Sequence, residues 1–299
     1  MIRAPIWRLD MNINDAVSSI FLPSLSLLNA ARKFNTVAVV MYHNITDDDA
    51  PSYRSIRIRD FRNEMRYLKE KCEVITIADL VKIYQNPSKL NKTSRPRVVI
   101  SVDDGFRDNY TNAFPILKEF GLPAAFFITT KDIHWEDELN GTGQRKLLNL
   151  NEMKEMRNHG MTFCSHTYSH PNLTRMGYED QKMEILRGME ELYERITDPE
   201  VRQVFAYPFG EYNQLTLEIL KELKFKLGLT VWHHLNGAYE NPLRLKRMTA
   251  DGRDNLLKFA CQLNPYVFKA YEWFLERTSN PNPRQKHSLK DMNSFVFEI

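Results

Sequence analysis

Cysteine is scarce in this chain of 299 residues, which contains three: Cys72, Cys164 and Cys261. They are far apart and odd in number, and this excludes the paired framework of a small secreted domain held by disulfides. We expect three buried thiols in a protein that works in a reducing compartment.

An excess of charge of one sign is also absent. The 41 basic and 38 acidic residues give a formal net charge of +3, so charge does not indicate a polyanionic partner and nucleic acid binding is not predicted. With 42% hydrophobic and 26% charged residues, the composition is that of an ordinary globular protein. The length suits one large α/β domain or two smaller ones, and we find no internal repeat and no low-complexity segment.

A membrane-spanning run is missing from the N-terminal part. The apolar stretch "DAVSSIFLPSLSLLNAARKF" (residues 15–34) is too short and contains Pro23, while Asp10 and Asp15 spoil the basic flank of a secretory signal. Apolar residues at roughly helical spacing predict one or two amphipathic helices over residues 13–31. These helices either dock on the domain or lie on a membrane surface.

Short apolar runs alternate with helical patterns along the rest of the chain. Strands are predicted at 36–43, 73–76, 97–104, 123–130, 161–167, 201–208 and 227–231, and helices at 58–72, 77–85, 109–121, 149–160, 178–196 and 213–224. This alternation predicts an α/β fold with a parallel sheet and covering helices, and the number of units favours a barrel over an open sheet.

Polar side chains follow several of these strands, at the edge where such folds build their active sites. They are His43, Asp103 with Asp104, His166 with His170, and Tyr207 with Pro208. The pair in "SHTYSH" together with a carboxylate from another strand would make a two-histidine, one-carboxylate metal site.

Each half of this site has a plainer explanation. The two histidines could satisfy backbone groups near a turn, and the vicinal acids could cap a helix. The combination is more specific, because a cation beside the two acids would keep both ionised at neutral pH. One carboxylate could then bind the cation while the other acts as a base.

Three motifs resemble those of one family. The stretches "SVDDGFRDNYTNAFPILKEFGLPAAFFI", "SHTYSHPNL" and "FAYPFGEYN" are similar to the successive signature motifs of the polysaccharide deacetylases with a NodB homology domain, carbohydrate esterase family 4. The resemblance runs from about residue 37 to about residue 250. It implies a distorted (β/α)7-type barrel that removes N-acetyl groups from amino sugars with a divalent metal ion, commonly Zn²⁺.

The same resemblance implies a role for each matching residue. Asp103 would be the general base, and Asp104, His166 and His170 would bind the metal. The backbone N–H assigned to Tyr207 would hold the oxyanion, against the alternative that Tyr207 belongs to an aromatic turn that closes a strand.

The general acid and the arginine that orients the base are placed by weaker patterns. No "L-x-H" motif follows residue 250, whereas "VVMYHNI" resembles a permuted branch of the family whose acid is a histidine after the first strand, here His43. His43 could instead be a satisfied histidine at a strand end. In "PLRLKRM", Arg247 is the better candidate for the ion pair with the base and Arg244 the lesser, although either could be a surface charge.

The chain is accordingly divided into three parts: an N-terminal amphipathic helical segment (1–35), a NodB-like deacetylase domain (36–255), and a C-terminal helix and tail packing on the barrel (256–299). The expected substrate is an N-acetylated glycan. The lack of a convincing export signal indicates a cytoplasmic location, with peripheral contact to the inner membrane face through residues 13–31. Two other functions stay open: an amidohydrolase acting on a small non-glycan amide, and a catalytically silent glycan-binding module.

Overall fold

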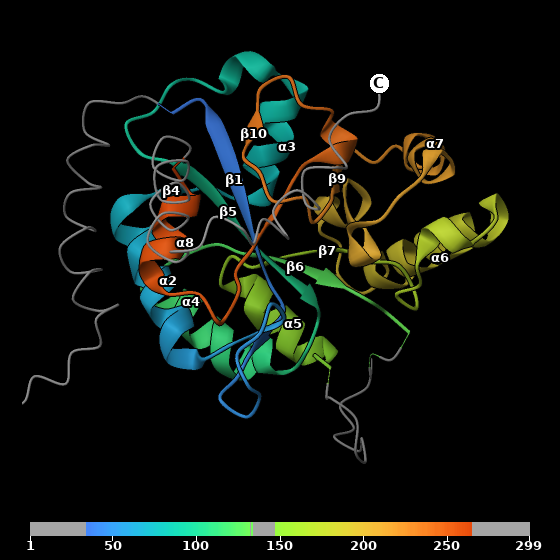
Figure 1. Cartoon of the computed structure of the whole chain (residues 1–299). Coiled ribbons are helices and arrows are strands. Elements are labelled where there is room, and N and C mark those ends of the chain that lie inside the picture. The colour runs from blue at the N-terminus through green and yellow to red at the C-terminus, as the bar shows by residue number, and fades with distance from the viewer. Residues whose placement is uncertain (1–33, 132, 134–146, 265–299) are drawn as a thin grey trace, which may run out of the picture.

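The computed structural model describes residues 34–131, 133 and 147–264 (Figure 1). The predicted segment 13–31 and most of the C-terminal tail lie outside these residues. Among the described residues, no helix has the length and apolar character needed to cross a membrane. Cys72, Cys164 and Cys261 are buried and free, as expected.

Nine strands in this part of the chain form one sheet, in the order β10-β1-β5-β6-β7-β8-β9, with β11 beside β1 and β4 beside β5. All neighbouring strands are parallel except β1 and β10. The strands are β1 (Thr36–Tyr42), β4 (Glu73–Val74), β5 (Arg97–Asp104), β6 (Ala125–Ile128), β7 (Thr162–Ser165), β8 (Val204–Ala206), β9 (Leu227–Leu229), β10 (Asn236–Gly237) and β11 (Met248–Thr249). A separate pair, β2 (Asn44–Ile45) and β3 (Ser55–Ile56), follows β1.

The sheet curls because one extended segment joins its two ends. Leu245 exchanges backbone hydrogen bonds with Gly228 and Thr230 at β9, and Ala250 donates its N–H to Met41 of β1. The segment between them includes β11, which pairs with β1. The α/β fold with a distorted, barrel-like sheet is therefore confirmed.

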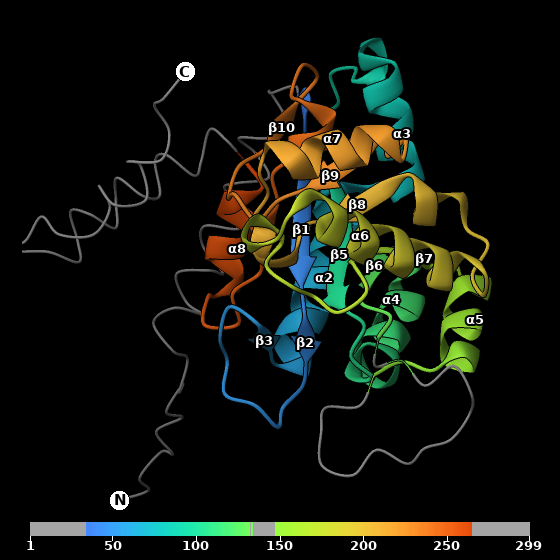
Figure 2. The ribbon, with the colours of Figure 1, turned by 90° about the vertical axis from the view of Figure 1, so that its right-hand side faces the viewer.

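Helices cover the outer face of this sheet (Figures 1 and 2). They are α2 (Ile58–Lys71), α4 (Phe114–Phe120), α5 (Leu150–Asn158), α6 (Tyr178–Tyr193), α7 (Gln214–Glu222) and α8 (Leu256–Gln262), while α3 (Ile77–Gln85) packs with the inward-facing residues. In α2 the apolar residues Phe61, Met65 and Leu68 share one face and are fully buried, as their helical spacing predicts.

Two-residue alternation in the strands decides what faces the interior. In β5, Val98, Ile100 and Val102 belong to the core under the helices, whereas Val99 belongs to the inner core. Because successive side chains of a strand point to opposite faces, Asp103 shares the inner face with Val99. The first acid of the "DDG" motif is thus directed into the curl of the sheet.

Candidate active site

Asp103 is held by Arg247 in a buried ion pair. Arg247 donates from Nη1 to Oδ1 of Asp103 at 2.7 Å and from Nη2 to Oδ2 at 2.8 Å. Its Nε donates to the carbonyl oxygen of Thr230 at 2.9 Å, and the guanidinium carbon lies 5.6 Å from the ring centre of Phe127. A two-pronged hydrogen bond of this kind fixes the plane of the carboxylate.

The ion pair keeps Asp103 ionised in spite of its burial. Burial raises the pKa of Asp103, but the charges of Arg247 and His166, with the hydrogen bonds from Arg247, outweigh it and hold the pKa to about 2. Asp103 is therefore a carboxylate at neutral pH. Each of its oxygens keeps a lone pair that can accept a further hydrogen bond.

Arg244 does not share this role. Its guanidinium carbon lies 5.4 Å from the ring centre of Tyr212, and Arg247 alone of the two predicted candidates contacts Asp103. The position of Arg247 follows from the extended segment that joins the two ends of the sheet. Arg247 lies in it between Leu245, which bonds to β9, and Ala250, which bonds to β1.

Asp104, His166 and His170 form a cluster suited to a cation. One ligand atom of each lies within 4.8 Å of the others. Oδ1 of Asp104 is 3.7 Å from Nε2 of His166 and 3.5 Å from Nε2 of His170, and this oxygen is buried without a hydrogen-bond partner among the described residues. Two imidazole nitrogens and one carboxylate oxygen are a common donor set for catalytic Zn²⁺, so the residues present fit the predicted metal.

The surroundings of His166 and His170 favour the forms of the imidazoles that bind metal ions. Nδ1 of His166 lies 2.7 Å from the carbonyl oxygen of Ala206, an acceptor that requires the proton on Nδ1, so Nε2 is the ring nitrogen that would bind a cation. Burial and the neighbouring His166 lower the pKa of His170 to about 4, so His170 is neutral at pH 7. Neutral imidazoles are the form that binds metal ions.

The backbone at this edge of the sheet is unusual. Asp104, Thr167, His170 and Phe209 all have positive φ, at 73°, 68°, 57° and 59°. Non-glycine residues rarely adopt this conformation, and such strain gathers at functional sites. The turn that carries Thr167 is also approached closely by α6 at Gly188, where a Cβ atom would lie 2.4 Å from the Thr167 carbonyl carbon.

His43 lies beside the two acids. The charges of Asp103 and Asp104 raise its pKa, but burial has the larger effect and lowers it from the ordinary value. Its Nδ1 is buried with no hydrogen-bond partner in the described part of the chain. An unpaired ring nitrogen next to the acids differs from the satisfied histidine that was the alternative.

The role predicted for Tyr207 is contradicted. Its backbone N–H donates to the carbonyl oxygen of Leu229 at 3.0 Å, which extends the pairing of β8 with β9, and its buried hydroxyl donates to the carbonyl oxygen of Leu243 at 2.7 Å. Neither group can reach an oxyanion. Two residues further on, Phe209 packs its ring 4.8 Å from that of His170, so its backbone N–H is the better candidate.

Sequence reasoning missed Arg54, which donates from Nη2 to Oδ2 of Asp104 at 2.9 Å. Arg54 immediately precedes β3, in a loop whose sequence carries no periodic pattern or motif. No signal in the sequence alone singled it out from the other arginines nearby.

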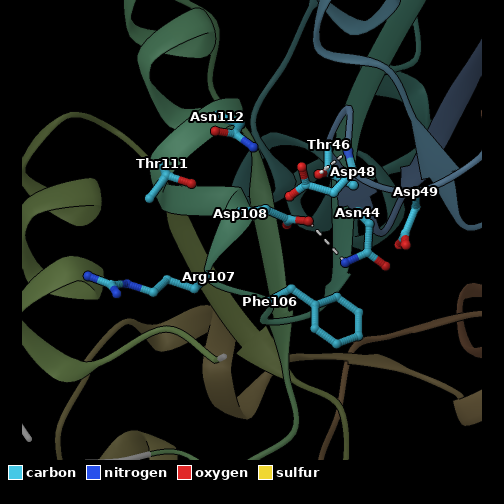
Figure 3. Close-up of a pocket in the computed structure, with 9 residues that line it drawn as sticks. All are labelled: Asn44, Thr46, Asp48, Asp49, Phe106, Arg107, Asp108, Thr111 and Asn112. Atoms are coloured by element: carbon cyan, nitrogen blue, oxygen red, sulfur yellow. Dashed lines mark hydrogen bonds between the residues drawn. The ribbon is translucent and has the colours of Figure 1, made fainter. Parts of the chain in front are cut away.

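A polar cavity lies at β2 and the loop that follows the "DDG" motif (Figure 3). It has a volume of about 400 Å³, within the range of small-ligand pockets. Asn44, which follows His43, lies in its wall and donates to Asp108 at 3.0 Å. The remaining wall residues are Thr46, Asp48, Asp49, Phe106, Arg107, Thr111 and Asn112.

Comparison with known proteins agrees with the motifs. A family model for polysaccharide deacetylases matches residues 90–228. Bacillus subtilis YxkH is 28% identical over 194 residues, which cover 64% of this chain and 63% of that relative. A poly-β-1,6-N-acetyl-D-glucosamine N-deacetylase from Staphylococcus aureus is 26% identical over 212 residues, which cover 67% of this chain and 69% of the relative.

Solved structures share the fold. The deacetylase PplD of Streptococcus pyogenes, solved with acetate, has 25% identity and a TM-score of 0.66 over 77% of this chain and 99% of its own. IcaB of Ammonifex degensii has 21% identity and a TM-score of 0.65 over 77% of this chain and 98% of its own. Residues 90–228 of this chain therefore match the polysaccharide deacetylase domain.

Proposed function

We propose that this protein is a metal-dependent hydrolase that removes N-acetyl groups from amino sugars of a polysaccharide or glycan precursor. The observation that carries the proposal is the position of the Asp104, His166 and His170 cluster directly beside the ionised, arginine-held Asp103. A Staphylococcus aureus relative is named for the deacetylation of poly-N-acetylglucosamine. PplD was solved with acetate, the acid that such a reaction releases.

Hydrolysis of an N-acetyl group needs an activated water, a place for the oxyanion and a proton for the departing amine. A divalent cation, which we take to be Zn²⁺, would acidify water and polarise the amide carbonyl when held by the three ligands. Asp103 accepts the proton of the attacking water through an oxygen that Arg247 keeps in place. The Phe209 N–H donates to the oxygen that becomes negative.

His43 completes the reaction as the general acid. The carbon–nitrogen bond breaks as the tetrahedral centre collapses, and the amine nitrogen takes a proton from the imidazole, so the products are acetate and a free amino sugar. Because burial lowers the pKa of His43, the resting imidazole is largely neutral. It therefore takes up a proton from solvent as negative charge develops next to it, and the proton that Asp103 removes from water returns to solvent after the products leave.

The polar cavity beside Asn44 supports a substrate larger than one N-acetyl group. Its amides, hydroxyls and carboxylates, together with the Phe106 ring, are the groups that hydrogen-bond to and stack on sugars. We propose that it takes a neighbouring sugar of the glycan. A small non-glycan amide would leave this cavity unused.

Acetate release tests the proposal. The protein loaded with Zn²⁺ is incubated with β-1,6- and β-1,4-linked N-acetylglucosamine oligomers, with free N-acetylglucosamine, and with simple acetamides. We expect acetate from an oligomer, little from the free sugar and none after chelation. Turnover of acetamides alone would favour the small-amide hydrolase, and no turnover of any substrate would favour the silent binding module.

A further inference from the structure

The two oxygens of Asp104 have different surroundings. Oδ1 faces the two imidazoles and is buried without a hydrogen bond among the described residues. Oδ2 accepts a hydrogen bond from Nη2 of Arg54 at 2.9 Å. The carboxylate is thus anchored at one oxygen and open at the other, and the open oxygen is the one that faces the candidate cation site.

The backbone of Arg54 is held in place from two sides. Its carbonyl oxygen accepts a hydrogen bond of 2.9 Å from the backbone N–H of Asn44, the residue that follows His43. On the other side, Gly252 donates its N–H to Ser52 at 2.9 Å, and a Cβ atom at Gly252 would lie 2.1 Å from the carbonyl oxygen of Ser55. The loop that carries Arg54 is therefore pinned between the end of β1 and the segment that follows Arg247.

Among the described residues, Asp104 alone accepts a hydrogen bond from the Arg54 guanidinium. Nε of Arg54 is buried with no hydrogen-bond partner in the described part of the chain. A buried donor without a hydrogen bond costs free energy, so another contact has to stabilise this position of the side chain. The hydrogen bond and ion pair with Asp104 provide this stabilising contact. The Arg54 side chain is 42% exposed and that of Asp104 is 10% exposed, so the pair lies at the mouth of the site.

We propose that Arg54 is a positioning residue for the metal site. It holds Oδ2 of Asp104 so that Oδ1 alone is presented to the cation, together with the two imidazoles. This inference rests on the proposed function, because it concerns the same three ligands. Hydrogen bonds from outside the ligand set commonly orient metal-binding carboxylates in this way.

A competing explanation makes the opposite prediction. Arg54 could be a counter-ion that pairs with Asp104 and competes with the cation for it. Removal of the competitor would then strengthen cation binding, whereas removal of a positioning contact weakens it. The direction of the change in affinity separates the two explanations.

The experiment measures Zn²⁺ and Co²⁺ affinity by competition with a chromogenic chelator, in the full chain. Arg54→Gln removes the positive charge and the guanidinium donors, whereas Arg54→Lys keeps a charged donor. Arg59→Gln is the matched control, because Arg59 is 77% exposed and pairs with Asp60, away from the site. We expect about 10- to 100-fold weaker binding in Arg54→Gln, a smaller loss in Arg54→Lys, and wild-type affinity in Arg59→Gln. The visible spectrum of bound Co²⁺ should also change in Arg54→Gln, since Asp104 can then bind through both oxygens.

Unchanged or tighter cation binding by Arg54→Gln, in a variant with wild-type thermal stability, overturns this inference and leaves the proposed function standing. Failure of the wild-type protein to bind any divalent cation overturns both. Restoration of affinity by Arg54→Lys above that of Arg54→Gln supports the positioning role, because a lost fold would not be rescued by a charged donor.

Discussion

Two fully buried carboxylates lie on opposite faces of the same sheet and behave in opposite ways. Asp103 points into the curl of the sheet and meets Arg247. Glu64 lies in α2 on the outer face, where the hydroxyl of Tyr42 donates to its Oε2 at 2.7 Å. Tyr42 is the last residue of β1, and His43, which lies beside Asp103, follows it directly in the chain.

The difference shows that the partner, and not burial itself, decides the charge of a buried acid. Burial raises the pKa of both groups. For Asp103 the charges of Arg247 and His166 outweigh burial and hold the pKa to about 2. For Glu64 the hydrogen bond from Tyr42 does not outweigh it, and the pKa rises to about 8. At pH 7, Asp103 is therefore a carboxylate and Glu64 is mainly the neutral acid.

Among the substitutions that test this difference between Asp103 and Glu64, Arg247→Met should have the largest effect on stability and activity. The substitution leaves the Asp103 charge buried without its partner, and loss of one member of such a pair costs about 3–5 kcal/mol in the free energy of unfolding. Acetate release should also fall by about 100-fold or more, because the base loses its orientation. Denaturant unfolding and the acetate assay measure the two effects.

Arg244→Met is the matched control for that experiment. Arg244 comes from the same segment but packs on Tyr212, so its loss should change stability by about 1 kcal/mol or less. Equal effects of the two substitutions would show that the ion pair with Asp103 has no special importance.

A smaller effect is expected from Glu64→Gln, and it depends on pH. The unfolded glutamate loses its proton near its ordinary pKa of 4.5, whereas the folded protein keeps it up to about pH 8. The folded state therefore binds more protons than the unfolded state between these values, so the stability contributed by Glu64 falls as the pH rises through this window. Glutamine is neutral throughout and should remove that part of the decline.

Free energies of unfolding at pH 5 and pH 8 check this prediction. Wild type should lose more stability than Glu64→Gln between the two values, and acetate release by the variant should stay close to wild type. An identical pH dependence in the two proteins would mean that Glu64 is ionised in the folded state, like Asp103.

The smallest effect should come from Tyr42→Phe, the counterpart of Arg247→Met on the outer face. It removes one neutral hydrogen bond to a group that remains protonated, and such bonds contribute about 0.5–1.5 kcal/mol. Thermal unfolding near pH 6 measures the change. A loss as large as that of Arg247→Met would contradict the distinction between the two acids.

Much of the candidate site was predictable because its residues lie in short local motifs. The "DDG" acids and the two histidines of "SHTYSH" follow strands with strong apolar patterns, and parallel strands bring their carboxyl ends to one edge. Arg247 was also predicted, although only the structure shows the closing segment that places it. The two acids and the two histidines were predictable because each pair lies at or directly after the end of a predictable strand.

The failures came from features that no local pattern carries. Tyr207 was assigned an oxyanion role because its position in the motif does not reveal that the pairing of β8 with β9 continues through its N–H. Arg54 reaches Asp104 through a loop between the two-residue strands β2 and β3, which are too short to show periodicity. Such contacts depend on tertiary packing and became visible only in three dimensions.

Acetate release by metal-loaded Asp103→Asn, measured beside wild type on the same N-acetylglucosamine oligomer, tests the central claim most directly. If Asp103 is the base beside the cation site, the rate should fall by about 10²- to 10⁴-fold, while Zn²⁺ affinity stays near that of wild type because Asp104, His166 and His170 are intact. Wild-type turnover by Asp103→Asn at full metal occupancy would contradict the account.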